Sequence, residues 1–162
     1  MPAEDLRFPL RWPADWKRTP RPGAARFERR SMAEVRERLL RELRLAGVPP
    51  WSIQISTNVP LTSRGQAASG ICQPADRGAA VYFQHGEQLL VSACDKWNRV
   101  EDNLYAIALD VEAVRGRLRW GVVSIERALA GHQRLGAPAQ ILLGPGDAPA
   151  GGAAGAGGAS CL

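Results

Sequence analysis

The chain has 162 residues, of which 45% are hydrophobic and 23% charged, a composition typical of one globular domain with a core of ordinary size. No apolar run approaches the roughly 20 residues of a membrane span, and the acidic first residues lack the order of a secretory signal. The three widely spaced cysteines contain no Cys-x-x-Cys pair, so we expect neither a zinc site nor a disulfide framework. We therefore predict a cytoplasmic protein without a membrane partner.

The net charge of +5 arises in the first third of the chain, where residues 1–50 hold twelve Lys or Arg against seven Asp or Glu. Most of these bases are arginines, whose planar guanidinium matches phosphate oxygens better than a lysine ammonium does. Two interpretations stay open: a surface that binds a polyanion, and the arginine-rich composition that a GC-rich genome produces.

Residues 1–30 contain five prolines, which exclude helix and favour extended backbone. Phe8, Trp12 and Trp16 are interleaved with these prolines and with basic residues. Because an exposed tryptophan is costly, we expect these rings to anchor the segment on the domain. The sequence thus predicts an extended N-terminal arm over residues 1–30.

A helix is predicted to begin after Ser31, because Ser31 and Glu34 together form a capping box. Apolar residues recur at helical spacing over 32–46, while charged residues such as Arg36 occupy the opposite face. Gly47 and the prolines that follow it end the helix.

Alternation of apolar and polar residues predicts a half-buried strand over 52–59. A β-hairpin follows, with strands over 80–84 and 88–93 and a turn at His85-Gly86. The next predicted element is a second helix over 100–115.

Ser124 is placed to cap a short third helix over 125–130. Beyond it, residues 136–162 consist mainly of Gly, Ala and Pro, cannot bury enough surface to fold, and are expected to be a disordered tail. The elements then run α-β-β-β-α-α. This order predicts an α+β domain over residues 31–135, in which two or three helices cover a small three-stranded antiparallel sheet.

Three carboxylates flank the junction between the hairpin and the second helix: Asp95, Glu101 and Asp102. Paired carboxylates can bind Mg²⁺ for phosphodiester cleavage. The run Asp102-Asn103-Leu104 at the start of a helix resembles the RusA-like Holliday-junction resolvases, but Val100 and Ala106 stand where that family has its first aspartate and its lysine. One interpretation is therefore a divergent Mg²⁺-dependent nuclease. The other is that Asp102 only stabilises the N-terminus of the helix, where the helix dipole is positive.

The same junction carries an aromatic ring between two cations, a pattern that can stack on a base and hold phosphate, although Trp97 could equally serve as a core anchor. No serine or cysteine stands at a spacing from histidine that suggests a nucleophile, and no glycine-rich loop forms a phosphate cradle, so we predict no cofactor. The residues predicted to bind nucleic acid are Lys17, Arg18, Arg21, Arg29 and Arg30 in the arm, and Lys96, Trp97 and Arg99 in the junction.

Several segments together form a wider pattern, which begins with Pro-Leu-Arg-Trp-Pro and includes Cys-Asp-Lys-Trp-Asn-Arg. These segments are 9–13, 19–20, 26–27, 39–43, 56–61, 76–83, 94–103 and 119–121. Over about residues 8–135 the pattern resembles uncharacterised proteins of bacteriophages and other mobile elements that are often labelled J-domain-containing. Residues 140–146 resemble the beginning of a J domain, but no amphipathic helix pair and no His-Pro-Asp follow. The resemblance therefore implies the N-terminal module of the family without Hsp70 co-chaperone activity.

These observations lead us to expect a non-enzymatic accessory module of phage or mobile-element origin that binds DNA or RNA, or a protein that handles nucleic acid. The Mg²⁺-dependent nuclease is the enzymatic alternative. A protein-binding adaptor or host-factor antagonist, with a host or phage protein as partner, is the third, and an exposed apolar patch would favour it.

Overall fold

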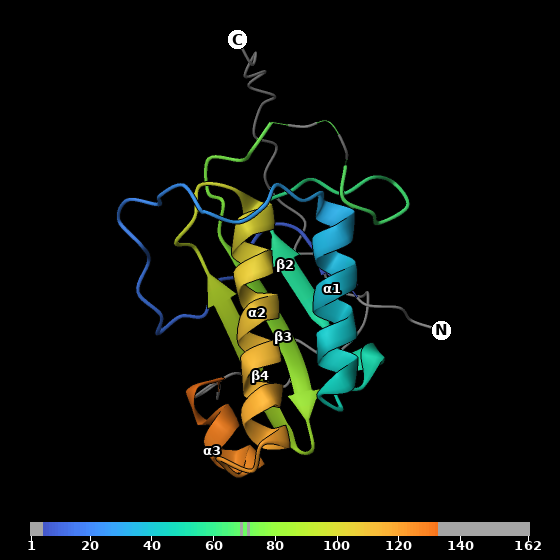
Figure 1. The fold of residues 1–162 in the computed structure, drawn as a ribbon. Helices are drawn as coiled ribbons and strands as arrows, with labels where there is room; N and C mark the ends of the chain where they lie inside the picture. The colour runs from blue at the N-terminus through green and yellow to red at the C-terminus, as the bar shows by residue number, and fades with distance from the viewer. Residues whose placement is uncertain (1–4, 69, 71, 133–162) are drawn as a thin grey trace.

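The computed structural model describes residues 5–68, 70 and 72–132, and these residues form the predicted α+β fold. One layer is a sheet and the other is made of helices (Figure 1). The strands are β1 (Asp5–Arg7), β2 (Gln54–Thr57), β3 (Ala79–His85) and β4 (Gln88–Cys94). The helices are α1 (Met32–Leu45), α2 (Val100–Arg119) and α3 (Ile125–Leu129), with short 3₁₀ helices at Pro50–Ser52 and Ala130–His132. The predicted tail, residues 136–162, lies outside the described residues.

The sheet has four strands in the order β1-β2-β3-β4 and is mixed, so the prediction of three antiparallel strands is wrong by one strand. β2, β3 and β4 pair antiparallel as expected, whereas β1 pairs parallel with β2, with Leu6 opposite Ile55. β1 lies within the segment predicted to be an arm. Its three residues are too few to carry an alternation of their own, and its partner lies far along the chain.

The turn between β3 and β4 lies one residue later in the chain than the predicted turn at His85-Gly86. His85 pairs with Gln88, so the turn consists of Gly86 and Glu87. Gly86 has φ 59°, a left-handed conformation that glycine adopts without steric cost.

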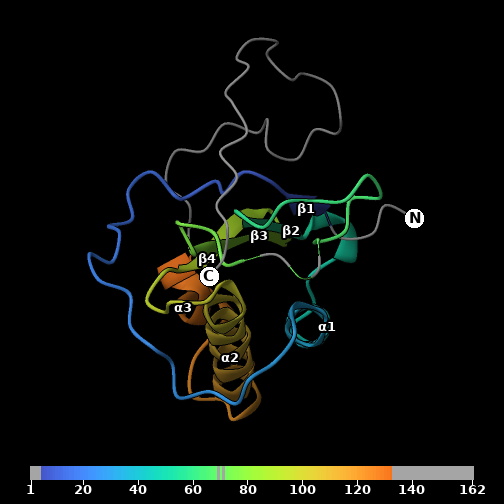
Figure 2. The same ribbon diagram turned by 90° about the horizontal axis from the view of Figure 1, so that it is seen from above.

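α1, α2 and α3 lie on one side of the sheet, as the view from above shows (Figure 2). The capping box at Ser31 and Glu34 is confirmed, and hydrogen bonds from Ser31 lower the pKa of Glu34. α2 extends four residues beyond its predicted end, to Arg119. Among the described residues, no helix is both long and apolar enough to cross a bilayer.

The second face of the sheet is covered by the N-terminal arm (Figure 2). Tyr82 and Val91 pack there against Leu10 and Trp16, and the Tyr82 hydroxyl donates a hydrogen bond of 2.7 Å to the carbonyl of Arg11. This cover explains why β2 is buried along its whole length rather than on alternate residues, as the sequence pattern had predicted.

Two further expectations need correction. Phe8 is 52% exposed, so it does not anchor the arm, whereas Trp12 and Trp16 are partly buried. Cys94 is a free thiol whose pKa is raised by burial. Cys72, however, is disulfide-bonded, so the cysteines form a disulfide bond where the sequence predicted no disulfide framework.

Candidate functional site

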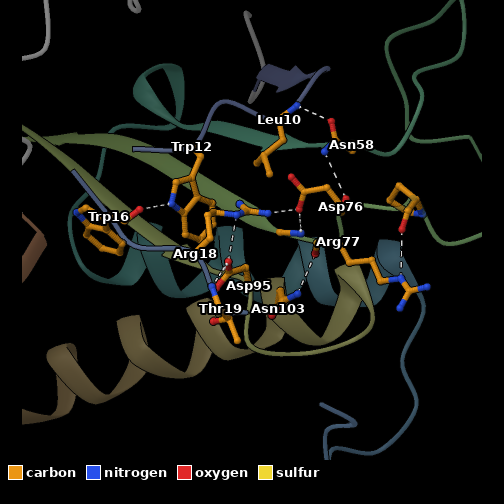
Figure 3. Close-up of polar contacts among 12 residues, drawn as sticks. Leu10, Trp12, Trp16, Arg18, Thr19, Asn58, Asp76, Arg77, Asp95 and Asn103 are labelled. Carbon is orange, nitrogen blue, oxygen red and sulfur yellow. Dashed lines mark hydrogen bonds and ion pairs between the residues drawn. The ribbon is translucent and has the colours of Figure 1, made fainter. Parts of the chain in front are cut away.

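Asp95 fastens the arm to the end of β4. Its carboxylate accepts hydrogen bonds from the backbone N–H of Thr19 (2.8 Å) and from the Thr19 hydroxyl (2.6 Å). Arg18 Nε lies 3.2 Å from the same carboxylate, and Figure 3 shows the three side chains meeting at this point. Asp95 is only 8% exposed. Both of its oxygens are therefore engaged by the protein itself, which leaves this carboxylate poorly placed to bind a metal ion.

Arg18 is held between two carboxylates and an aromatic ring. It pairs with Asp76 as well as with Asp95, and its guanidinium lies 4.2 Å from the centre of the Trp12 ring (Figure 3). These contacts neutralise a cation that the sequence predicted to bind nucleic acid. Lys17 and Arg21, which flank Arg18 in the sequence and were also predicted to bind nucleic acid, are exposed.

Asn103 organises the chain before α2. It is fully buried, accepts a hydrogen bond from the Trp97 N–H, and donates to the carbonyls of Trp97 and Arg77, all at 2.8 to 2.9 Å. The first N–H of α2, from Val100, donates to the side chain of Gln73 at 2.9 Å. The Asp-Asn-Leu run therefore serves local architecture here, with Asn103 as its centre.

An aromatic cluster fixes the chain that enters α1. The Phe27 ring meets the edges of Trp97 and Tyr105, with centroids 5.6 Å and 5.0 Å apart. The guanidinium of Arg30 lies over Tyr105 at 4.6 Å, while Lys96 lies 5.2 Å from the Trp97 ring. Trp97 is half-buried and contacts the protein's own side chains. The cluster thus places Arg30, and its neighbour Arg29, beside the N-terminal end of α2.

A cavity of about 770 Å³ opens beside these arginines. Four separate segments of the described chain form it: β1, the start of α1 with the residues before it, the loop between β2 and β3, and the start of α2. The basic side chains that line it are Arg29, Arg30, Arg36 and Arg99, and among the described lining residues the one that is acidic is Glu101. The residues that the sequence singled out at positions 29, 30 and 99 are therefore brought together, although they are far apart in the chain.

The positive charge of this cavity is only partly compensated by the protein. Glu101 accepts a hydrogen bond of 2.8 Å from Gln73 and lies 3.5 Å from Arg99. Asp102 lies 3.8 Å from Arg99. Burial raises the pKa of Asp102, whereas the positive charges of Arg99 and, to a smaller extent, Arg29 oppose this shift. Arg29 is exposed and makes neither a hydrogen bond nor an ion pair within the described part of the chain. Arg30 pairs with Glu28 at 3.2 Å, and Arg36 also has an interaction partner. Arg29 is therefore the cation of this wall that the described residues leave without an ion pair.

The three carboxylates of the nuclease hypothesis do not gather into one site. Asp95 faces Thr19 and Arg18, whereas Glu101 and Asp102 face Arg99. Within residues 5–68, 70 and 72–132, no group of three or more His, Cys, Asp or Glu has the geometry to hold a metal ion. The geometry of the described residues therefore gives the nuclease hypothesis no metal centre.

One member of the cationic cavity was not among the candidates from the sequence. Arg36 belongs to the charged face of α1, which the helical pattern assigns to solvent. It lies four residues after Met32 and therefore on the same side of the helix as the first turn, where Met32 also lines the cavity. This four-residue spacing is the sequence signal that places Arg36 beside Met32. It gives no information on the loop between β2 and β3 that completes the cavity wall.

No family model, no curated protein and no solved structure matches this chain. The resemblance to mobile-element proteins stays a prediction.

Proposed function

We propose that the chain is a non-enzymatic accessory module that binds nucleic acid, with the arginine-lined cavity as the place where phosphate groups bind. The observation that carries the proposal is the convergence of Arg29, Arg30, Arg36 and Arg99 on one cavity, with Glu101 as the acidic residue in the described part of its wall. Guanidinium groups donate paired hydrogen bonds to phosphate oxygens. A mobile-element origin and a cytoplasmic location belong to the same proposal, although the disulfide at Cys72 is uncommon in a reducing cytoplasm.

The arrangement of the cations favours phosphate over an acidic protein surface as the ligand. Arg30 is stacked on Tyr105, and Arg99 is held by Glu101 and Asp102, so both guanidinium groups are positioned before a ligand arrives. A pre-positioned planar donor loses less conformational entropy on binding than a free side chain does. Fixed arginines around a concave site suit tetrahedral phosphate groups that present several acceptor oxygens.

The test is binding of a labelled oligonucleotide across a salt series. For a single strand, the slope of log K against log salt is about −0.7 per phosphate contacted. We expect Arg29→Ala combined with Arg36→Ala to reduce that slope by about 1.4 and to weaken binding roughly a hundredfold at low salt, or about tenfold per arginine.

The matched control replaces Lys17 and Arg21 by Ala, because these two arm cations are exposed and do not line the cavity. It removes the same charge and should change binding less than threefold. Equal losses in the two double variants would mean diffuse attraction to a basic chain, and unchanged binding by the cavity variant would overturn the proposal.

A protein-binding adaptor is the second candidate, and it rests on a different observation. Trp51 and Trp120 are 60% and 68% exposed, although large aromatic side chains normally contribute to buried surface. Their replacement by Ser should abolish capture of a partner protein while leaving oligonucleotide binding intact. Loss of oligonucleotide binding in these variants would instead assign both tryptophans to the nucleic-acid surface.

A further inference from the structure

We infer that the cavity accepts the terminal nucleotide of a single strand, with a terminal phosphate against the arginines, and not the side of a duplex. This inference rests on the proposed function and narrows it to one class of nucleic acid. It is based on the size of the cavity and on its wall, one part of which is cationic and the other apolar.

The wall has a cationic part and an apolar part. The cationic part consists of Arg29, Arg30, Arg36 and Arg99. The apolar part comes from β1, the first turn of α1 and the loop between β2 and β3, and it includes Leu6, Met32, Val59, Ala67 and Pro74. A nucleotide has the same two characters, since its phosphate is anionic and the faces of its base are apolar. Inorganic phosphate alone would leave the apolar part of the wall in water.

The volume of the site sets the size of the ligand. Cavities of roughly 300 to 1,000 Å³ hold small molecules, and 770 Å³ lies within that range. A duplex is wider than its major groove, which alone measures about 12 Å. It is therefore too large to enter a site of this volume. A duplex could touch only the rim of the cavity, whereas a flexible single-stranded end can reach the interior.

The charge of the site favours a terminal phosphate over an internal one. A phosphomonoester carries about −1.5 to −2 charges near pH 7, whereas each phosphodiester in a strand carries one. It also offers three terminal oxygens to the surrounding donors. Arg29, which forms no ion pair with a described residue, is the cation best placed to gain from the additional charge.

The experiment compares four labelled 12-residue strands by fluorescence anisotropy. They carry either a phosphate or a hydroxyl at the 5′ end, or either group at the 3′ end, with the label at the opposite end. Blunt duplexes of the same sequence and the free mononucleoside monophosphates serve as competitors. A single charge-assisted hydrogen bond corresponds to roughly a tenfold change in affinity or more, so we expect phosphorylation of one of the two ends to strengthen binding about tenfold.

The variants then separate the cavity from the rest of the surface. Arg29→Ala should remove the preference for the phosphorylated end, whereas Lys17→Ala combined with Arg21→Ala should keep it. Arg29 is exposed and free of ion pairs within the described chain, so its replacement should leave the thermal unfolding midpoint unchanged, which is measured on the same samples.

Each outcome bears on one of the two proposals. A preference for a phosphorylated single-stranded end, with duplex and mononucleotide competing at least tenfold less well, supports the inference. Equal binding of phosphate and hydroxyl ends at both termini, or competition by duplex as strong as by single strand, overturns the inference and leaves the proposed function standing. Competition by mononucleotides as strong as by the strand overturns it as well, since the ligand would then be a free nucleotide. No binding of any strand at low salt overturns the proposed function itself.

Discussion

Replacing Asp95 by Ala should detach the arm from the sheet. The carboxylate accepts two hydrogen bonds from Thr19 and lies 3.2 Å from Arg18 Nε. A hydrogen bond to a charged group contributes about 1.5–3 kcal/mol, and we take the lower end because Thr19 regains water once the arm opens. The Arg18 pair adds less than about 1 kcal/mol, since the Arg18 side chain is 40% exposed. We therefore expect the free energy of unfolding to fall by about 3 kcal/mol.

The assay combines urea unfolding, followed by tryptophan fluorescence, with trypsin digestion in the absence of urea. Lys17 and Arg18 are trypsin sites within the arm, and cleavage there should become the earliest event in the Asp95→Ala variant. Thr19→Val is the matched control, because it removes the hydroxyl bond but keeps the backbone N–H bond to Asp95. It should cost about 1–1.5 kcal/mol.

A double-mutant cycle between the two positions then measures their coupling, for which we expect about 1 kcal/mol. The reasoning is refuted if Asp95→Ala unfolds at the same urea concentration as the unmodified protein and its arm resists trypsin equally well. In that case the packing of Leu10 and Trp16 on Tyr82 alone would hold the arm.

Three further predictions concern stability and are checked by urea unfolding. Asn103→Ala removes three buried hydrogen bonds and should cost about 3 kcal/mol; a loss below 1 kcal/mol would contradict its central role. Glu42→Ala should cost about 2–3 kcal/mol, because Glu42 is buried and accepts two hydrogen bonds from Arg115 across the α1–α2 interface. An unchanged free energy of unfolding would show that water replaces Glu42 as the partner of Arg115 without loss. Burial raises the pKa of Asp102 above its ordinary 3.8, so this carboxyl favours folding most below that pH and loses the advantage as the pH rises through its folded value. Asp102→Asn should accordingly be at least as stable as the unmodified protein at pH 7 and equally stable near pH 3. If the variant were clearly less stable at pH 7, the pKa of Asp102 would be lowered by folding and not raised.

The elements that depend on local signals could be predicted from the sequence. The start of α1 is determined by the contact between Ser31 and Glu34, three residues apart, and the β3–β4 hairpin by two neighbouring apolar runs around Gly86. Both are visible within a short window of sequence, and the α+β class followed from their order.

The features that depend on distant contacts could not be predicted in the same way. β1 exists because Leu6 lies opposite Ile55. β2 is buried on both faces, and not on alternate residues, because the arm covers its outer face. The cavity has the same origin. Arg29, Arg30 and Arg99 were candidates as separate basic residues, but their convergence depends on the Phe27 cluster and on a loop with no regular pattern.

The arm that covers the sheet also has a consequence for the order of events during synthesis. The carbonyl of Arg11 receives its hydrogen bond from Tyr82, a residue 71 positions later in the chain. At about 5–20 residues per second, the ribosome needs roughly 4 to 14 s to add that stretch. During this interval Trp12 and Trp16 have no sheet to cover, so the first part to be made is among the last to dock. A nascent chain stalled before β3 would expose these rings to chaperones. Once synthesis resumes and the sheet forms, the rings should become buried.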